Sequence, residues 1–327
     1  MVASVSLPLL TTSSPRTNRR DHLDIWEKPL TNTPATLRDP DYKLRPDFDK
    51  IRERGRDPRT PERLIAHYAL ERRLSDRLRH APRDARGAVY TEVYRELAAS
   101  LPDHPQNVVA RSTAVDRIDQ QLRQIVGLLD RDSAFLEIGC GTAALAFAVA
   151  QRASIAYAVD VTDVWVNFAA APSNFRFIQT DGVEIPLPAA SVDLAYSNQL
   201  MEHLHPDDAA DQLREIQRVL KPGGRYICIT PSRLTGPHDI SCYFDYEATC
   251  FHLREYDYGT LRALFRDAGF TRFLCYVHAR GHEVRIAFPI LHMLELVFLA
   301  FPAQIRAALT RPIPVCGALG LNAIGIK

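Results

Sequence analysis

Apolar positions along the chain follow two periods, one typical of helices and the other typical of buried strands. In residues 60–131, apolar side chains fall three or four positions apart, as at Val115, Ile118 and Leu122. The first helix of this segment is expected to begin at Pro61, because proline suits the first turn of a helix. Residues 60–131 are therefore expected to form a helical subdomain, which serves either as structural packing or as a cap over a ligand pocket.

From residue 132 onward, short apolar strands alternate with amphipathic helices. Strands are expected at residues 134–138, 154–159, 175–179, 192–197 and 225–230. This alternation predicts an α/β fold with a parallel sheet covered by helices. A helix is expected between the fourth and fifth strands, with Pro206, Asp207 and Asp208 in its first turn, where acidic groups suit the helix dipole.

Residues 1–59 lack both periods, and an extended or disordered N-terminal arm is expected there. Met1 to Arg20 contains serine, threonine, proline and three arginines but no acidic residue. That composition is compatible with a transit peptide, although a disordered leader is the preferred interpretation.

The overall composition is that of a globular protein without a strong charge bias. Charged residues make up 24% and hydrophobic residues 46% of the 327 positions, and the formal net charge is +1. This balance gives no global field that would attract nucleic acid or an anionic membrane. The six cysteines form no C-x-x-C pair, which argues against a zinc site or a disulfide framework. We therefore expect a cytoplasmic protein with no metal centre.

The first chemical signal is a glycine turn between a buried strand and the helix that follows it. Gly139 and Gly141 interrupt the apolar run from Phe135 to Ala150. Glycine allows the unusual dihedral angles of a tight turn and lets a ligand approach the backbone. The N–H groups at the start of the helix then point towards that ligand. Alone, the turn also fits an ordinary connection or NAD binding.

Acidic residues follow at distances that suit nucleotide binding. Asp160 ends the second strand, 21 residues beyond Gly139, where a carboxylate can bind both hydroxyls of a ribose. Asp181 and Gly182 follow the third strand, and Lys221-Pro-Gly-Gly224 ends the helix before the fifth strand. Their joint order and spacing are more specific than any single motif.

The chain from about residue 133 to residue 278 resembles the class I S-adenosylmethionine-dependent methyltransferases, in the broad subgroup that acts on small molecules and glycans. The matching motifs are E-I-G-C-G-T (137–142), A-V-D-V (158–161), Q-T-D-G (179–182), V-D-L-A-Y-S-N (192–198), E-H-L (202–204), V-L-K-P-G-G (219–224) and H-L-R-E-Y (252–256). The resemblance implies that residues 132–327 form a Rossmann-like sheet of seven strands. The sheet would be mostly parallel, with residues 321–327 as an antiparallel last strand and residues 279–319 as a helical insertion before it.

The resemblance also implies S-adenosylmethionine as cofactor and a role for each matching residue. Glu137, Gly139 and Gly141 would surround its methionine end, and Asp160 would hold its ribose. Ala143 stands where the family usually has a third glycine, and we expect this small residue to be tolerated.

Four more residues would reach the cofactor from the third and fourth strands. Asp181 would face the adenine amino group, with the backbone of Gly182 beside the ring. Ser197 and Asn198 would lie at the end of the fourth strand, below the sulfonium. This placement agrees with the rule that ligands of open parallel sheets bind outside the carboxyl ends of the strands.

Two histidines are the candidate catalytic residues. Methyl transfer from a sulfonium is an in-line displacement, and a hydroxyl acceptor must also lose its proton, a task that suits histidine near neutral pH. His203 follows the fourth strand, and His238 lies beside Asp239 in the loop after the fifth. Each is weighed against a structural or substrate-contacting role, and Tyr243 and His252 are further pocket candidates.

The expected activity is methyl transfer to a small molecule or a sugar, most simply to oxygen. One alternative is methylation of nitrogen or carbon on a lipid-like acceptor, and another is a regulatory or scaffold protein that binds the cofactor without turnover. Nucleic acid is not expected as a substrate, because the fourth strand ends in S-N-Q-L (197–200) rather than an N-P-P-Y-type motif.

The insertion at residues 279–319 is too long for a simple hairpin, and long connections usually carry function or an interface. Its apolar part includes Arg285 and Glu295, so a transmembrane span is not expected. We expect a substrate lid, a contact in a homodimer or a membrane-surface patch.

Overall fold

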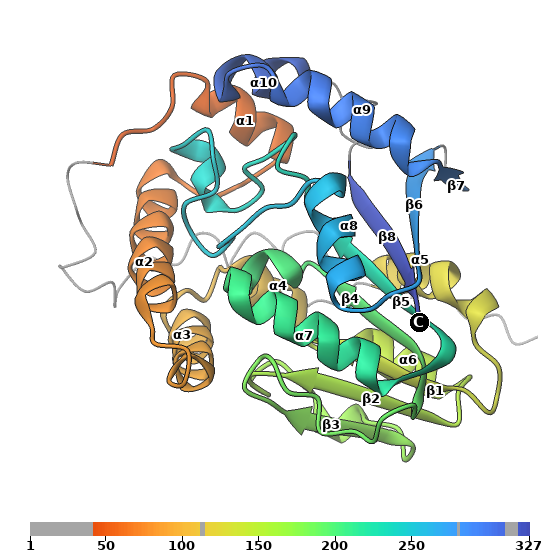
Figure 1. Ribbon diagram of the computed structural model, residues 1–327. Coiled ribbons are helices and arrows are strands. Elements are labelled where there is room, and N and C mark those ends of the chain that lie inside the picture. Colours follow the sequence, from red (N-terminus) through yellow and green to blue (C-terminus); the bar gives the residue numbers. More distant parts are fainter. Residues whose placement is uncertain (1–41, 112–114, 280–281, 311–319) are drawn as a thin grey trace, which may run out of the picture.

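A sheet of eight strands forms the centre of the molecule and carries helices on both faces (Figure 1). The computed structural model describes residues 42–111, 115–279, 282–310 and 320–327. The strands are β1 (Ala134–Ile138), β2 (Ile155–Asp160), β3 (Phe175–Gln179), β4 (Val192–Asn198), β5 (Leu220–Thr230), β6 (Arg272–Ala279), β7 (His282–Ile286) and β8 (Leu321–Ile326). The expected Rossmann-like α/β fold is thus confirmed.

The strand order is β3-β2-β1-β4-β5-β8-β6-β7. Strands β1 to β5 pair in parallel, whereas β8 lies antiparallel between β5 and β6, as expected for the last strand. The expected number of seven strands is too low by one. Residues 282–286 fold back on β6 as an antiparallel edge strand. They were missed because an edge strand of five residues buries too little apolar surface to show a clear alternation.

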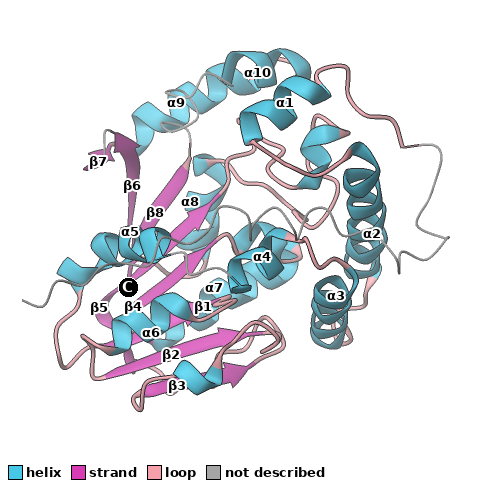
Figure 2. Cartoon of the chain, turned by 180° about the vertical axis from the view of Figure 1, so that it is seen from behind, coloured by secondary structure: helices cyan, strands magenta, loops and turns pink. Residues whose placement is uncertain are grey.

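Helices cover the sheet because successive side chains of each strand point to opposite faces. On β1, Phe135 packs under α6 (Ala144–Ala150), while Leu136 belongs to the cluster under α7 (Pro206–Val219). Helix α5 (Val115–Ile125) joins α6 on its face, and α8 (Tyr258–Asp267) joins α7 on the other (Figures 1 and 2).

Three helices, α2 (Pro61–His80), α3 (Arg86–Ser100) and α4 (Pro105–Arg111), lie beside the carboxyl ends of the strands (Figure 2). Helix α2 begins at Pro61 as predicted, after a Thr60 side chain that accepts a hydrogen bond from the Arg63 N–H. A buried cluster fastens this layer to the core. The Tyr90 hydroxyl donates to Asp208 at 3.1 Å and accepts from the His205 N–H at 2.7 Å.

The segment before α2 departs from expectation. Residues 48–55, expected to be extended, form α1 (Phe48–Gly55). Phe48 is buried, and its ring meets Tyr243 edge to face at a centroid distance of 5.5 Å. Phe48 and Ile51 pack against one apolar cluster and dock this short helix, which shows no period in the sequence. Residues 1–41 of the expected arm lie outside the described residues.

The insertion contains β7 and two helices, α9 (Phe288–Leu299) and α10 (Ala303–Thr310). Its part at residues 311–319 lies outside the described residues. Glu295 anchors α9 to the start of α8, because its carboxylate accepts from the Tyr258 N–H at 2.5 Å. Among the helices of the described residues, none has the length and hydropathy that a membrane span requires.

Candidate cofactor and acceptor site

The glycine turn takes the backbone shape that its sequence predicted. Gly139 and Gly141 have φ angles of 66° and 51°, which side chains rarely adopt. A Cβ at Gly139 would lie 2.7 Å from a methyl group of Leu200, whereas a Cβ at Gly141 would meet open space. Ala143 adopts the same left-handed region, with φ at 55°. The turn is therefore shaped for a ligand over Gly141, and alanine takes the conformation that a third glycine would favour.

Glu137 lies beneath this turn. Its carboxylate accepts from the Ala146 N–H at 2.9 Å and fixes the first turn of α6. Burial raises the pKa of Glu137 to about 8. This contact makes Glu137 an anchor of the turn, and the side chain does not line the cavity at the methionine position that the resemblance implied.

Asp160 joins the turn from β2. Its Oδ2 accepts from the Gly141 N–H at 2.9 Å, and burial raises the pKa of Asp160 to about 6. The side chain lines a narrow cavity of about 60 Å³ together with Gly139, Gly141 and Gly182. A carboxylate at the end of β2 beside a bare glycine backbone fits a ribose next to the methionine position.

Asp181 and Gly182 are placed differently from each other. The Asp181 carboxylate accepts from the Val183 and Glu184 N–H groups, both at 2.8 Å, and its residue packs against Gly87 of α3 rather than lining the cavity. Gly182, with φ at 91°, does line it. The structure therefore brings Gly182 to the cofactor position and uses Asp181 to shape the loop.

The end of β4 separates Ser197 from Asn198. Ser197 is fully buried, and its hydroxyl pairs with that of Tyr226 at 2.7 Å on the core side of the sheet. Asn198 instead lines a second cavity of about 390 Å³, beside the first. Tyr94, Gln106, Gly139, Gln199 and His203 line both cavities.

His203 therefore lies where the two cavities meet. Its Nδ1 is 3.1 Å from the carbonyl oxygen of Phe251. Because a carbonyl can only accept, Nδ1 carries the proton and Nε2 keeps a free lone pair. Burial, reinforced by the charge of His252, lowers the pKa of His203 to about 3, so the ring is neutral. A neutral ring with a free Nε2 can accept a proton.

Two groups beside His203 carry strongly shifted pKa values. Glu202 is buried, and one carboxylate oxygen lies 3.9 Å from His203 Nε2. Burial raises the pKa of Glu202 to about 7. For His252 burial acts in the opposite direction, but the hydrogen bond to Glu255 at 2.8 Å and the charges of Asp239 and Glu202 raise its pKa to about 9. Perturbed groups that gather in one cleft are typical of functional sites.

His238, Tyr243 and His252 all line the second cavity, as the sequence analysis expected of pocket residues. His238 Nε2 lies 2.7 Å from the Thr235 hydroxyl and 3.2 Å from the Ser232 carbonyl oxygen. Those partners hold its Nε2 proton, so Nδ1 is the His238 nitrogen that keeps a lone pair. Of the two candidate bases, His203 lines both cavities, whereas His238 lines only the second.

Helices α2 and α4 and the residues just before them supply cavity residues that sequence reasoning missed. Arg59, His67, Glu71 and His104 line the second cavity opposite the sheet. Only the spacing of His67 and Glu71, one helical turn apart, could have indicated that they act together. Their approach to His104 depends on the tertiary fold.

Comparison with known proteins agrees with the geometry. Residues 136–228 match the family described as "Methyltransferase domain". A probable S-adenosylmethionine-dependent methyltransferase of Mycobacterium tuberculosis (strain ATCC 25618 / H37Rv) is 36% identical over 136 residues, 41% of this chain and 47% of that protein. A demethylmenaquinone methyltransferase of Staphylococcus epidermidis (strain ATCC 12228 / FDA PCI 1200) is 26% identical over 169 residues, 43% of this chain and 69% of that protein.

A crystal structure of an S-adenosylmethionine-dependent methyltransferase from Archaeoglobus fulgidus aligns with a TM-score of 0.45 and 16% identity, over 72% of this chain and 100% of that one. The chain spans about half the length of the first curated relatives it matches. The matched segment, residues 136–228, is similar to methyltransferase domains, and the relatives that share it include S-adenosylmethionine-dependent methyltransferases.

Proposed function

We propose that this protein transfers a methyl group from S-adenosylmethionine to a hydroxyl oxygen of a small molecule or a sugar. The observation that carries the proposal is the position of His203, which lines both cavities and keeps Nε2 free. The narrow cavity holds the cofactor in this proposal, and the second cavity holds the acceptor. His203 then takes the hydroxyl proton as the carbon–oxygen bond forms.

The cofactor cradle uses the backbone of Gly139, Gly141 and Gly182 with the carboxylate of Asp160. When bound, S-adenosylmethionine supplies an electrophilic methyl group on its sulfonium. The cradle is narrow, and we expect it to widen when the cofactor binds. Tyr94 and Gln106, which close it from the cap, are the side chains that we expect to move. This arrangement supports a cap role for residues 60–131.

Burial of His203 keeps it neutral but disfavours the cation that forms when it takes a proton. Glu202, 3.9 Å from Nε2, is placed to stabilise that cation once its carboxyl is ionised. The Phe251 carbonyl holds the ring in the productive tautomer. His203 is therefore proposed as general base, with Glu202 and Phe251 as positioning groups.

Methylation of nitrogen or carbon on a lipid-like acceptor is the second candidate. It is supported by the relative named demethylmenaquinone methyltransferase and by apolar side chains that α9 and α10 expose. These are Ile290, Met293, Leu294, Leu296, Val297, Ile305 and Leu309, and the exposed Phe301 lies between the two helices. Within the described residues neither helix lines the acceptor cavity. This supports a dimer contact or a membrane-surface patch rather than a substrate lid.

We propose a cytoplasmic location.

The cofactor proposal is tested by calorimetry with S-adenosylmethionine on the wild type and on Asp160→Ala. We expect binding by the wild type and a loss of affinity of about tenfold or more in the variant. Preference for NAD, or equal affinity of both proteins, would overturn it. Deleting residues 286–312 should leave cofactor affinity intact while it alters turnover or the mass in solution.

The acceptor proposal is tested by turnover on a panel of phenols, monosaccharides and glycosides, amines and isoprenoid quinols. Mass spectrometry with fragmentation locates the transferred methyl group. Methylation of oxygen supports the proposal, and methylation of nitrogen or carbon supports the second candidate. Cofactor binding without turnover of any member would favour the regulatory or scaffold alternative.

A further inference from the structure

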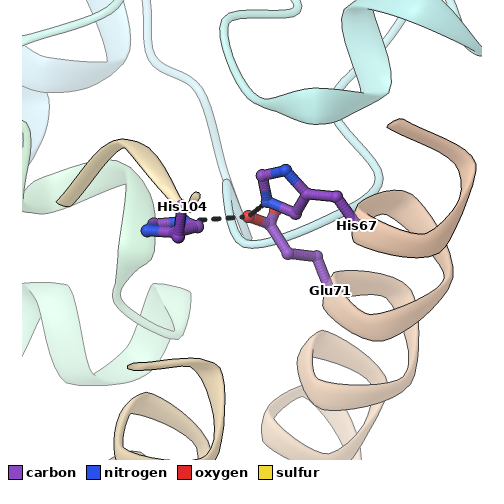
Figure 3. Close-up of side chains that lie close together, drawn as sticks. All are labelled: His67, Glu71 and His104. Carbon is purple, nitrogen blue, oxygen red and sulfur yellow. Dashed lines mark hydrogen bonds and ion pairs between the residues drawn. The ribbon is translucent and has the colours of Figure 1, made fainter. Parts of the chain in front are cut away.

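Two histidines and a glutamate meet on the cap wall of the acceptor cavity (Figure 3). His67 and Glu71 lie one turn apart on α2, and His104 immediately precedes α4. Glu71 Oε1 is 2.6 Å from His67 Nε2 and 3.4 Å from His104 Nε2. Two histidines and a carboxylate at such distances could hold a metal ion.

The tautomers of the histidines argue against a metal. His67 Nδ1 lies 2.5 Å from Arg59 Nη1, and a guanidinium can only donate. His104 Nδ1 accepts from the Gln106 N–H at 3.2 Å. Both rings therefore carry their proton on Nε2 and point it at Glu71. A metal would need those Nε2 lone pairs and would force each Nδ1 proton against another donor.

Of the two carboxylate oxygens of Glu71, one has hydrogen-bond partners and the other has none among the described residues. Oε1 receives both histidines, whereas Oε2 is buried and has no hydrogen-bond partner among the described residues. The Glu71 side chain is only 5% exposed. Although burial opposes ionisation, the Nε2–H groups of His67 and His104 attract the carboxylate and donate hydrogen bonds to it, and they hold the pKa of Glu71 well below its usual range. An ionised, buried oxygen without a partner is costly, which is typical of a site that a ligand completes.

We propose that Glu71 Oε2 binds a hydroxyl of the acceptor other than the one that is methylated. This inference rests on the proposed function, because it names a recognition point within the same cavity. A hydroxyl suits Oε2 because it can donate a hydrogen bond to the carboxylate, in a cavity that Arg59, His252 and Asp239 also line. The acceptor would thus carry at least two hydroxyl groups.

The consequence is selectivity for polyhydroxylated acceptors. An acceptor without the second hydroxyl would enter the cavity but leave Glu71 Oε2 unpaired. Sites built around a hydrogen bond to a substrate hydroxyl reject the analogue that lacks it much more strongly than apolar pockets reject a change of size. His67, His104 and Arg59 would act as positioning residues that keep Glu71 ionised and aimed.

The test compares wild type, Glu71→Gln and Glu62→Gln, an exposed glutamate at the start of the same helix. Ligand-observed NMR with S-adenosylhomocysteine present would follow binding of catechols and methyl glycosides, each paired with its monodeoxy or mono-O-methyl analogue. We expect at least one polyol to bind the wild type and Glu62→Gln about tenfold or more tightly than it binds Glu71→Gln. The matched deoxy analogue should bind all three proteins alike.

Equal binding of the polyol by Glu71→Gln and the wild type, or binding of no polyol, overturns the proposal. Calorimetry with Zn²⁺ and Mn²⁺ tests the alternative that these residues bind a metal ion. Stoichiometric metal binding that His67→Ala abolishes would also overturn it, in favour of a metal site. S-adenosylmethionine affinity, measured on all variants, separates this outcome from failure of the proposed function, because Glu71→Gln should keep the cofactor affinity of the wild type.

Discussion

The Nδ1 of His203 donates a hydrogen bond to the carbonyl oxygen of Phe251 at 3.1 Å. This bond joins the segment after β4 to Phe251, which lines the second cavity and lies 48 residues further along the chain. It also fixes the imidazole tautomer, because the carbonyl can only accept. The free Nε2 of His203 is thus a consequence of one backbone contact.

The first prediction concerns His203 itself. His203→Ala should lower kcat on a hydroxyl acceptor by about 10²- to 10⁴-fold, the range for loss of a general base. S-adenosylmethionine affinity, measured by calorimetry, should change little. His80→Ala, on the exposed end of α2, is the matched control and should retain full activity. Full activity of His203→Ala would remove the histidine from the mechanism, and His238→Ala would then be tested as the base.

The second prediction separates backbone strain from ligand contact at Gly141. Gly141 and Gly223 both have positive φ angles, 51° and 77°, and a Cβ at either would meet no atom within 4 Å. Alanine at either position should therefore cost about 1 kcal/mol of stability from backbone strain alone. Chemical unfolding measures that loss.

Only Gly141→Ala should also lose S-adenosylmethionine affinity, by about tenfold or more, because the added methyl group would enter the cradle. Gly223→Ala is the control, since Gly223 lies outside both cavities. Equal cofactor affinity of the two variants would place the cofactor elsewhere.

The third prediction is a dependence of stability on pH that arises at Glu137. Burial raises its pKa to about 8 in the folded protein, above the ordinary value of 4.5. Between these two pH values the folded state holds a proton that the unfolded state has released. Stability therefore falls as pH rises from 4.5 to 8, by an amount on the order of 4 kcal/mol for this group.

Glu137→Gln should remove this part of the slope. The amide oxygen of glutamine can still accept from the Ala146 N–H, so the contact that fixes α6 is kept. Urea unfolding at several pH values between 5 and 8 measures the effect, and the variant should be the more stable protein at pH 8. Parallel stability curves for the two proteins would show that Glu137 is not protonated in the folded state.

Local patterns predicted the core of the fold, whereas tertiary contacts decided the site. The glycine turn, Asp160 and Gly182 line one cavity, because they follow strands whose apolar runs are clear in the sequence. Ser197 and Asn198 are adjacent on one strand and therefore point to opposite faces, so both could not line a single cavity. A shift of one position along β4 therefore places the Ser197 hydroxyl in the core and the Asn198 side chain at the second cavity.

The cap residues could not be predicted in the same way. Arg59, Glu71 and His104 approach one another only when α2 and α4 pack beside the sheet, and no spacing in the sequence records that contact. A helical period reports which residues are buried but not which polar side chains meet. The sequence thus predicted more residues of the narrow cavity than of the second cavity.

The last prediction concerns Glu202. Burial raises its pKa to about 7, and one of its oxygens lies 3.9 Å from His203 Nε2. A carboxyl group is ionised above its pKa, so the negative charge that stabilises protonated His203 is present above pH 7 and is lost below it. The kcat on a hydroxyl acceptor should therefore rise with pH through about 7.

Glu202→Gln should flatten this rise and lower the plateau about tenfold, because a neutral amide cannot supply the charge. Steady-state turnover from pH 5.5 to 9 measures both effects, and S-adenosylmethionine affinity at each pH excludes a change in cofactor binding. Thr230→Val, which removes the hydroxyl that donates to Glu202 at 2.9 Å, should move the midpoint to higher pH, since that hydrogen bond stabilises the ionised form. An unchanged profile in Glu202→Gln would assign the rise to another group and leave His203 without a carboxylate partner.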